Sequence, residues 1–264
     1  MKKTEILQNI EKCEKENRYN DLVDSYGHII RHPVTPDYNY IKTGFWNKFG
    51  CTLSVGIFNF AGSVIAPYCR LKIVGKENLK DFNGGAIATV NHVNMIDSVL
   101  VKKALKHKKL KITVAEFNNY GGLFGKILRG AGTMPFSSSV NAMKHLSQGI
   151  TYYLQQNNFI LFYPEATLWW CYEKPRPLLD GAYFYATKNN VPIVPMFFTF
   201  KNLRKRRDGT YRKKFILHIG QPIYPKANLT PKENIAYLKN ANFEYNKKIY
   251  EEFYNKKLEY VVNE

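Results

Sequence analysis

His92 and Asp97 stand five positions apart in a stretch that could carry out acid–base chemistry. They follow the apolar run 86–90, which predicts a buried strand. His92 then falls at the carboxyl end of that strand, where open α/β sheets gather their ligand sites. A turn of this length lets the carboxylate reach one imidazole nitrogen and leaves the other as a proton acceptor. The pair is the His–Asp half of a hydrolase triad without its serine. A substrate hydroxyl in the serine's place could lose its proton to His92 and attack an activated acyl group.

Three further blocks give this pair a context. On the pair alone, a histidine held in the core or in a loop is the better explanation. The run 132–136 is apolar, begins with glycine and precedes three serines. The run 161–167 ends a predicted strand in Pro164-Glu165, and the run 191–196 reads VPIVPM. Four blocks in this order argue against accident.

In order and spacing, the four blocks resemble the glycerophospholipid acyltransferase superfamily, which includes the 1-acylglycerol-3-phosphate acyltransferases. Its members carry NHxxxxD, G-x-x-F/P-x-x-R, F-P-E-G-T-R and V-P-I-V-P blocks, and the resemblance covers residues 71–220. It implies an enzyme that moves a fatty acyl group from a thioester to a hydroxyl. The acyl donor would be carried by coenzyme A or by acyl-carrier protein. No tightly bound cofactor and no metal are expected.

The resemblance also implies roles for individual residues. His92 would be the general base and Asp97 would orient it, while Gly132 would line the same cleft. Because a thioester is already activated, the enzyme must mainly position the hydroxyl and deprotonate it. The residues expected to bind substrate are Gly132, Thr133, Glu165, Ala166, Thr167, Lys174 and Arg176.

The sequence departs from the family where an acceptor phosphate would bind. Ser138 stands in place of the arginine of the second block, and Leu168 in place of the arginine of the third. A bidentate arginine is not easily replaced. Lys144, Lys174 and Arg176 could serve a phosphate from another direction, or they could be solvated surface charges. A lysophospholipid-like acceptor is the first expectation, and a glycolipid or sugar hydroxyl is the alternative.

Trp169 and Trp170 follow directly after this third block. Their rings could stack on a sugar, lie at a membrane interface or belong to the core. The altered blocks also leave open a non-catalytic, lipid-binding relative of the family.

The elements that must position these residues alternate between strands and helices. Strands are predicted at 71–74, 86–90, 111–115, 133–136, 159–163, 193–199 and 215–219. Helices are predicted at 98–106, 123–128, 140–155 and 181–188. This alternation predicts an α/β fold with a mostly parallel central sheet flanked by helices. Thr230, Pro231 and Glu233 predict the start of a C-terminal helix, which the pattern extends to Val262. Residues 71–264 would form the α/β acyltransferase domain, and residues 1–70 a helical region.

The segment 49–69 carries no charged residue and has basic residues on both flanks. Its length could span a bilayer, but a spanning helix usually has its positive excess on one side. Two basic flanks favour a segment that contacts one leaflet, and a buried core helix is the third possibility.

The charge balance points to a polyanionic partner. The 264 residues include 39 Lys and Arg against 21 Asp and Glu, a net charge of +18, yet 45% are hydrophobic. This apolar content excludes a disordered basic tail. No nucleic-acid-binding motif is present, so nucleic acid is not the expected partner, although a basic nucleic-acid-binding protein is the remaining alternative. An anionic membrane surface is the expected partner. The four cysteines show no metal-binding spacing, and so few in a chain of this length do not suggest a disulfide framework. A reducing compartment is therefore expected, which places the protein on the cytoplasmic face of a membrane with peripheral or monotopic attachment.

Overall fold

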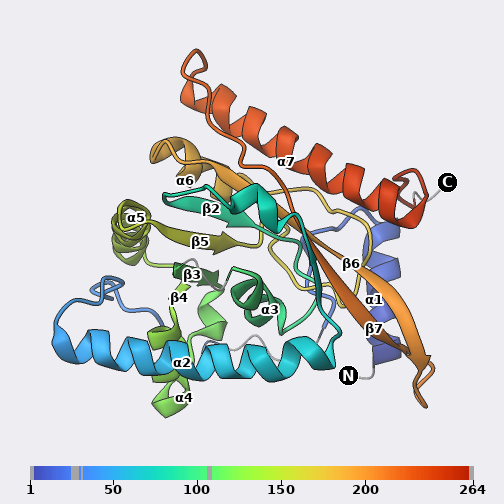
Figure 1. Cartoon of the computed structure of the whole chain (residues 1–264), viewed down its shortest axis with the longest axis horizontal. Coiled ribbons are helices and arrows are strands. Elements are labelled where there is room, and N and C mark those ends of the chain that lie inside the picture. The colour runs from blue at the N-terminus through green and yellow to red at the C-terminus, as the bar shows by residue number, and fades with distance from the viewer. Residues whose placement is uncertain (1–2, 25–29, 31, 106–108, 262–264) are drawn as a thin grey trace.

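The computed structural model describes residues 3–24, 30, 32–105 and 109–261. A seven-stranded sheet runs through its centre in the order β1-β7-β6-β2-β5-β3-β4 (Figure 1). The pair β6–β7 is antiparallel and the other pairs are parallel. The strands are β1 Lys72–Val74, β2 Ala86–Thr89, β3 Lys109–Val114, β4 Thr133–Pro135, β5 Asn158–Phe162, β6 Ile193–Lys205 and β7 Tyr211–Ile219. All seven strands coincide with the predicted runs, and the expectation of a mostly parallel sheet is confirmed.

Helices cover both faces of this sheet (Figure 1). On one face lie α2 Phe45–Tyr68, α3 Asp97–Ala104 and α4 Gly122–Ala131, and on the other lie α5 Val140–Gln155, α6 Gly181–Lys188 and α7 Pro231–Tyr254. The remaining helices are α1 Lys3–Lys15 and the short 3-10 turns η1 Lys76–Leu79 and η2 Glu116–Asn118.

Two apolar layers hold the helices to the central strands. Ala88 and Leu161 point into the layer shared with α2 and α3, whereas Ile87 and Ile160 point into the layer shared with α5 and α6. Successive residues of a strand face opposite sides of the sheet. Both sides of β2 and β5 are therefore buried, which explains why their sequences are continuous apolar runs.

The largest differences from the predicted bounds are at α7 and β6. The C-terminal helix α7 starts with the expected capping box of Thr230 and Glu233, but it ends at Tyr254. Asn255 then adopts a left-handed conformation with φ 51°, which terminates the helix. The predicted end at Val262 lies outside the described residues. Strand β6 runs on to Lys205, because its polar second half still pairs with β7 in an exposed antiparallel ribbon.

Described parts of the N-terminal region pack against the rest of the chain. Ile6 and Ile10 of α1 share an apolar cluster with Trp169, and Tyr40 belongs to the core beside α5. Helix α2 occupies the uncharged segment and runs along the base of the molecule in Figure 1. The boundary near residue 70 stays a prediction of the sequence.

Candidate active site

His92 and Asp97 lie between β2 and α3, and they are in contact. The Nδ1 atom of His92 is 3.1 Å from Oδ2 of Asp97. The same oxygen accepts hydrogen bonds from the backbone N–H groups of Val93 and Asn94, each at 2.8 Å. Three donors on one carboxylate oxygen fix the turn. A proton on Nδ1 satisfies Asp97 and leaves Nε2 as the acceptor nitrogen.

The carboxyl group of Asp97 is completely buried. Burial raises its pKa, while the hydrogen bonds from His92 and from the backbone oppose that shift. The ionised carboxylate therefore depends on the neighbouring imidazole for its stabilisation. A proton taken up on Nε2 would place an imidazolium beside this carboxylate, which is how the aspartate of a catalytic triad supports its histidine.

The imidazole of His92 is held in place by Tyr163, which follows directly after β5. The two rings stack with centroids 4.1 Å apart and planes 29° from parallel. The His92 side chain is 21% exposed, and its Nε2 atom has no hydrogen-bond partner within the described part of the chain. The imidazole thus offers one nitrogen at the surface while the rest of the ring is fixed. Tyr163 was missed at the sequence level, although its place at a strand end beside Pro164-Glu165 was a usable signal.

Glu165 connects the His92 loop to the loop that follows β5. Its Oε2 atom accepts from the backbone N–H of His92 at 3.4 Å and lies 2.9 Å from Nη2 of Arg176. Its Oε1 atom accepts from the backbone N–H of Arg176 at 3.0 Å. Glu165 and Arg176 are each at most 1% exposed, so this is a buried ion pair. Glu165 therefore braces the backbone that carries His92.

Arg176 binds protein groups in place of a ligand. Its Nη1 atom donates to the carbonyl of Tyr19 at 2.9 Å and to the hydroxyl of Thr167 at 3.1 Å. Its guanidinium stacks on Trp169, 4.7 Å from the ring centroid. A guanidinium with no exposed surface cannot meet a phosphate, so this placement corrects the expectation that Arg176 binds substrate. It also settles Trp169 as a core residue.

Lys174 is likewise engaged within the protein. Its Nζ atom binds a carboxylate oxygen of Glu14 in α1 at 2.5 Å, and its side chain is 22% exposed. This ion pair fastens α1 to the loop that follows the third block. Substrate binding by Lys174 stays a prediction of the sequence, and this ion pair with Glu14 would have to open for it.

Ala166 and Thr167 shape the loop that faces His92. Ala166 has φ 65°, in the left-handed region that favours glycine, and the family motif carries glycine at this position. Two backbone bonds join the loops: the N–H of Trp169 donates to the carbonyl of His92 at 3.0 Å, and that of Cys171 to the carbonyl of Val93 at 2.8 Å. Ala166 therefore turns the chain so that it can pair with the His92 loop.

Gly132 and Thr133 lie elsewhere. Across the sheet, Thr133 of β4 pairs with Ile112 of β3, Ile112 pairs with Leu161 of β5, and Leu161 pairs with Ala88 of β2. Ala88 lies four residues before His92. Four residues and three strand spacings correspond to roughly 19 Å. This placement corrects the expectation that Gly132 lines the His92 cleft. A glycine directly before a strand marks its amino end, whereas His92 follows the carboxyl end of its own strand.

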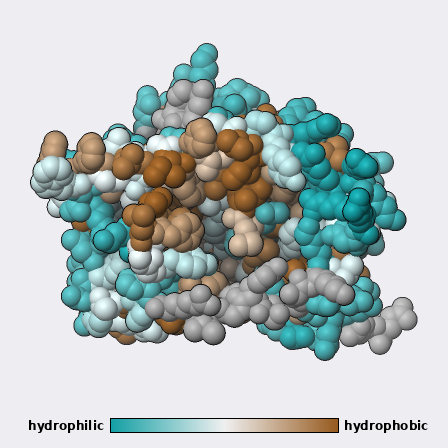
Figure 2. All heavy atoms as spheres, turned by 90° about the horizontal axis from the view of Figure 1, so that it is seen from below, coloured by the Kyte–Doolittle hydropathy of each residue, from teal (hydrophilic) through white to brown (hydrophobic). Residues whose placement is uncertain are grey.

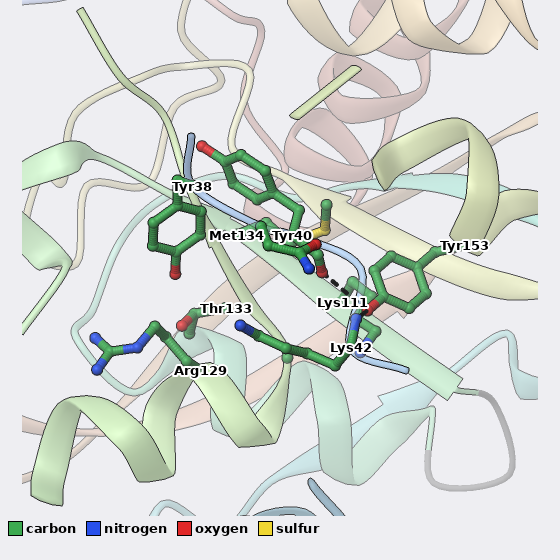
Figure 3. Close-up of a pocket in the computed structure, with 10 residues that line it drawn as sticks. Tyr38, Tyr40, Lys42, Lys111, Arg129, Thr133, Met134 and Tyr153 are labelled. Carbon is green, nitrogen blue, oxygen red and sulfur yellow. Dashed lines mark hydrogen bonds between the residues drawn. The ribbon is translucent and has the colours of Figure 1, made fainter. Parts of the chain in front are cut away.

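Gly132 and Thr133 instead line a second hollow with Lys42, Lys111 and Arg129 (Figure 3). We call it the cationic hollow. The hollow is shallow: its walls enclose room for little more than one water molecule, and the rest of it is open to solvent.

The two positions where the family carries arginine hold no cation. The backbone N–H of Ser138 donates to a carboxylate oxygen of Glu116 at 3.1 Å. Leu168 follows Thr167 in the braced loop. The neighbourhood of Ser138 is thus acidic where the family motif places a guanidinium.

An apolar patch occupies part of the face of the molecule shown in Figure 2. Within the described residues, α2 is the one helix long and apolar enough to cross a membrane, and only 17% of its most apolar window is buried. A core helix is therefore the wrong interpretation of the uncharged segment. The large apolar side chains exposed on α2 and α4 are Phe45, Trp46, Phe49, Leu53, Ile57, Phe60, Val64, Leu123 and Phe124. Such a continuous surface is typical of a membrane-associated protein.

Comparisons with known proteins agree with this fold and these motifs. Residues 70–199 match the family model described as Acyltransferase. No curated protein sequence matches the chain. Among solved structures, the chain is similar to the 1-acyl-sn-glycerophosphate (LPA) acyltransferase PlsC from Thermotoga maritima, with a TM-score of 0.57 and 18% identity. The alignment covers 78% of this chain and 81% of that one. The family match spans the motif blocks around His92 and Glu165, and the structural likeness shows that the chain shares the fold of that enzyme.

Proposed function

We propose that this protein is an acyltransferase that moves a fatty acyl group from a thioester to a hydroxyl of a lysophospholipid-like acceptor at a membrane surface. The observation that carries the proposal is the His92–Asp97 pair, with Nδ1 bound to a buried carboxylate and Nε2 left without a protein partner in the described chain. The donor is an acyl group on coenzyme A or on acyl-carrier protein.

In the proposed reaction, Nε2 of His92 removes the proton of the acceptor hydroxyl as its oxygen attacks the thioester carbonyl. Asp97 stabilises the imidazolium that forms. The tetrahedral intermediate then collapses, the C–S bond breaks, and the proton on Nε2 passes to the leaving thiolate. An acyl ester and a free thiol result, and the histidine returns to its neutral form.

Attachment to the membrane would use α2 without a crossing. Ser54 of α2 packs so closely on α4 that a Cβ atom added to Gly130 would lie 2.3 Å from its hydroxyl. Further along α2, Ser63 accepts a hydrogen bond from Lys103 of α3 at 3.0 Å. A helix fastened to the body over this length favours monotopic attachment, with its outer face in one leaflet. The cytoplasmic leaflet is the proposed one.

The headgroup of the acceptor has a second candidate. Ser138 and Leu168 stand where the family carries arginines, and Arg176 forms a buried ion pair with Glu165. These placements give a specific reason to consider an acceptor without a phosphate at that position, such as a glycolipid or sugar hydroxyl.

The direct test incubates the purified protein with an acyl thioester and a panel of lysophospholipids and glycolipids. Mass spectrometry should detect a new acyl ester on at least one acceptor, together with release of one thiol per ester. Failure of every acceptor in the presence of vesicles would contradict the proposed function and favour a non-catalytic lipid-binding protein.

A further inference from the structure

The cationic hollow lies at the end of the strands opposite to His92, and it gathers positive charge from three distant segments. Lys42 precedes α2, Lys111 lies in β3, and Arg129 lies in the last turn of α4. Figure 3 shows the side chain of Lys42 extending toward Thr133, with the stem of Arg129 on the other side of that threonine and its guanidinium turned outward. These residues are far apart in the sequence, so only the fold brings them to one hollow.

The cations of the hollow have no carboxylate partner among the described residues. Lys111 lies over the ring of Tyr153 at 4.1 Å from the centroid, and Lys42 lies 5.8 Å from the ring of Tyr38. Arg129 donates to neutral groups, the side-chain oxygen of Asn119 and the carbonyl of Tyr120. Aromatic faces and neutral oxygens stabilise a cation less than a carboxylate does.

Holding these charges together costs free energy. Burial lowers the pKa of Lys42, and the charge of Arg129 lowers it further. Burial also lowers the pKa of Lys111, to which Lys42 adds its own repulsion. Three cations kept close together without a counter-charge suit an anionic ligand that supplies it.

The walls of the hollow are fixed. The hydroxyl of Tyr153 donates to the carbonyl of Tyr40 at 3.0 Å and accepts from the backbone N–H of Lys42 at 3.1 Å. The hydroxyl of Tyr40 donates to the carbonyl of Pro135 in β4 at 2.8 Å. The segment that carries Lys42 is therefore tied to the edge of the sheet, so the cations are positioned before any ligand arrives.

The position of the hollow indicates where the anion comes from. Phe45 and Trp46 follow Lys42 by three and four residues and are 74% and 80% exposed. Exposed tryptophan at the start of an apolar helix is typical of the headgroup level of a bilayer. The acceptor's own headgroup is excluded, because its reacting hydroxyl must reach His92, roughly 19 Å away by strand spacing.

We propose that Lys42, Lys111 and Arg129 form a binding site for the phosphate group of an anionic phospholipid in the membrane on which the protein sits. The site is separate from the acyl-transfer site. It holds the start of α2 against the bilayer and gives the membrane attachment a preference for anionic lipid.

The test measures binding of the full chain to vesicles of phosphatidylcholine alone and of phosphatidylcholine mixed with phosphatidylglycerol. The double substitution Lys42→Gln/Arg129→Gln should weaken binding to the anionic vesicles about 25-fold, since each cation near the surface contributes a factor of about five. Binding to the neutral vesicles should not change. The matched control, Lys232→Gln/Lys256→Gln, removes the same charge at exposed positions at either end of α7. It should leave the anionic preference nearly intact.

If the two double variants lost equal affinity for anionic vesicles, the binding would depend on net charge alone, and the proposed site would be wrong. A parallel arm measures the thermal midpoint with inorganic phosphate. Inorganic phosphate could raise the thermal midpoint of the wild type but not that of Lys42→Gln/Arg129→Gln. If the two proteins then bound vesicles equally well, the ligand of the site would be free phosphate, and the proposal of a lipid would be wrong. If the double variant unfolds, Lys42→Gln alone serves, with an expected loss of about fivefold. The readout is binding, so its failure leaves the proposed acyl transfer standing.

Discussion

The loops around His92 and the cationic hollow treat positive charge in opposite ways. Beside His92, the guanidinium of Arg176 is fully buried, and Glu165, Thr167 and the carbonyl of Tyr19 satisfy it. In the hollow, Lys42 and Lys111 meet only aromatic rings among the groups described. Charge that is paired inside the protein braces a loop, whereas charge left unpaired at a surface is available to a ligand. The first expectation from sequence, that Arg176 binds substrate, reversed these two roles.

The largest effect should come from breaking the paired region. Glu165→Gln leaves the Arg176 guanidinium buried without its counter-charge, which should lower the free energy of unfolding by about 3–5 kcal/mol. Urea denaturation measures it. The matched control is Glu11→Gln, which removes the exposed partner of Lys15 and should leave the free energy of unfolding nearly unchanged. Equal losses in the two variants would show that the buried pair does not brace the His92 loop.

Asp97→Asn tests the other half of the paired region. An asparagine can present an amide N–H to Nδ1, which favours the wrong imidazole tautomer, and in a catalytic triad this change lowers kcat by about 10⁴. We expect a fall in kcat of at least about 100-fold with little change in KM. A rise in KM at constant kcat would instead assign Asp97 to substrate binding.

In the cationic hollow, removing a charge should raise the free energy of unfolding instead of lowering it. Lys111→Met deletes a half-buried, unpaired cation and should raise the free energy of unfolding by up to about 1 kcal/mol in the absence of lipid. The wild-type lysine has a lowered pKa when folded, so the unfolded chain binds more protons between that pKa and the usual value. Wild-type stability therefore rises with pH in that window, and the advantage of the variant should shrink there. Destabilisation by Lys111→Met would mean that the hollow is satisfied by groups of the protein itself.

The smallest effect concerns the backbone beside His92. Ala166→Gly relieves a left-handed alanine at φ 65° and should stabilise the protein by about 0.5–1 kcal/mol, after the entropy of the added glycine is subtracted. Thermal unfolding measures it. The control is Ala142→Gly in α5, where glycine should destabilise by a similar amount because the residue is helical and buried. Loss of stability in both variants would contradict strain at Ala166.

Sequence reasoning reached the local parts of this structure. The seven strands and the His92–Asp97 contact depend on neighbours within a few positions, and a five-residue turn leaves the carboxylate few places to go. The capping box at Thr230 was equally local. Contacts made over long sequence separations were out of reach. The Arg176–Tyr19 bond joins residues 157 positions apart, and no spacing rule connects Lys42 to Arg129.

The misplacement of Gly132 has a different cause. The motif order placed Gly132 in the same cleft as His92, yet the strand predicted at 133–136 already implied that Gly132 sits at an amino end. Sites in parallel sheets gather at carboxyl ends. The direction of the predicted strand could therefore have shown that Gly132 lies away from His92. It also favours a separate role for the residues at the amino end of β4.

The central claim is that the free nitrogen of His92 removes the proton of the acceptor. The most direct measurement is kcat for thiol release with His92→Ala, beside the thermal midpoint of the same protein. A positioned general base contributes about 10²–10⁴ in rate, so kcat should fall by at least about 100-fold. Because the His92 ring is partly exposed, the midpoint should stay within about 4 °C of the wild type. A variant that folds normally and retains kcat within about threefold would contradict the account.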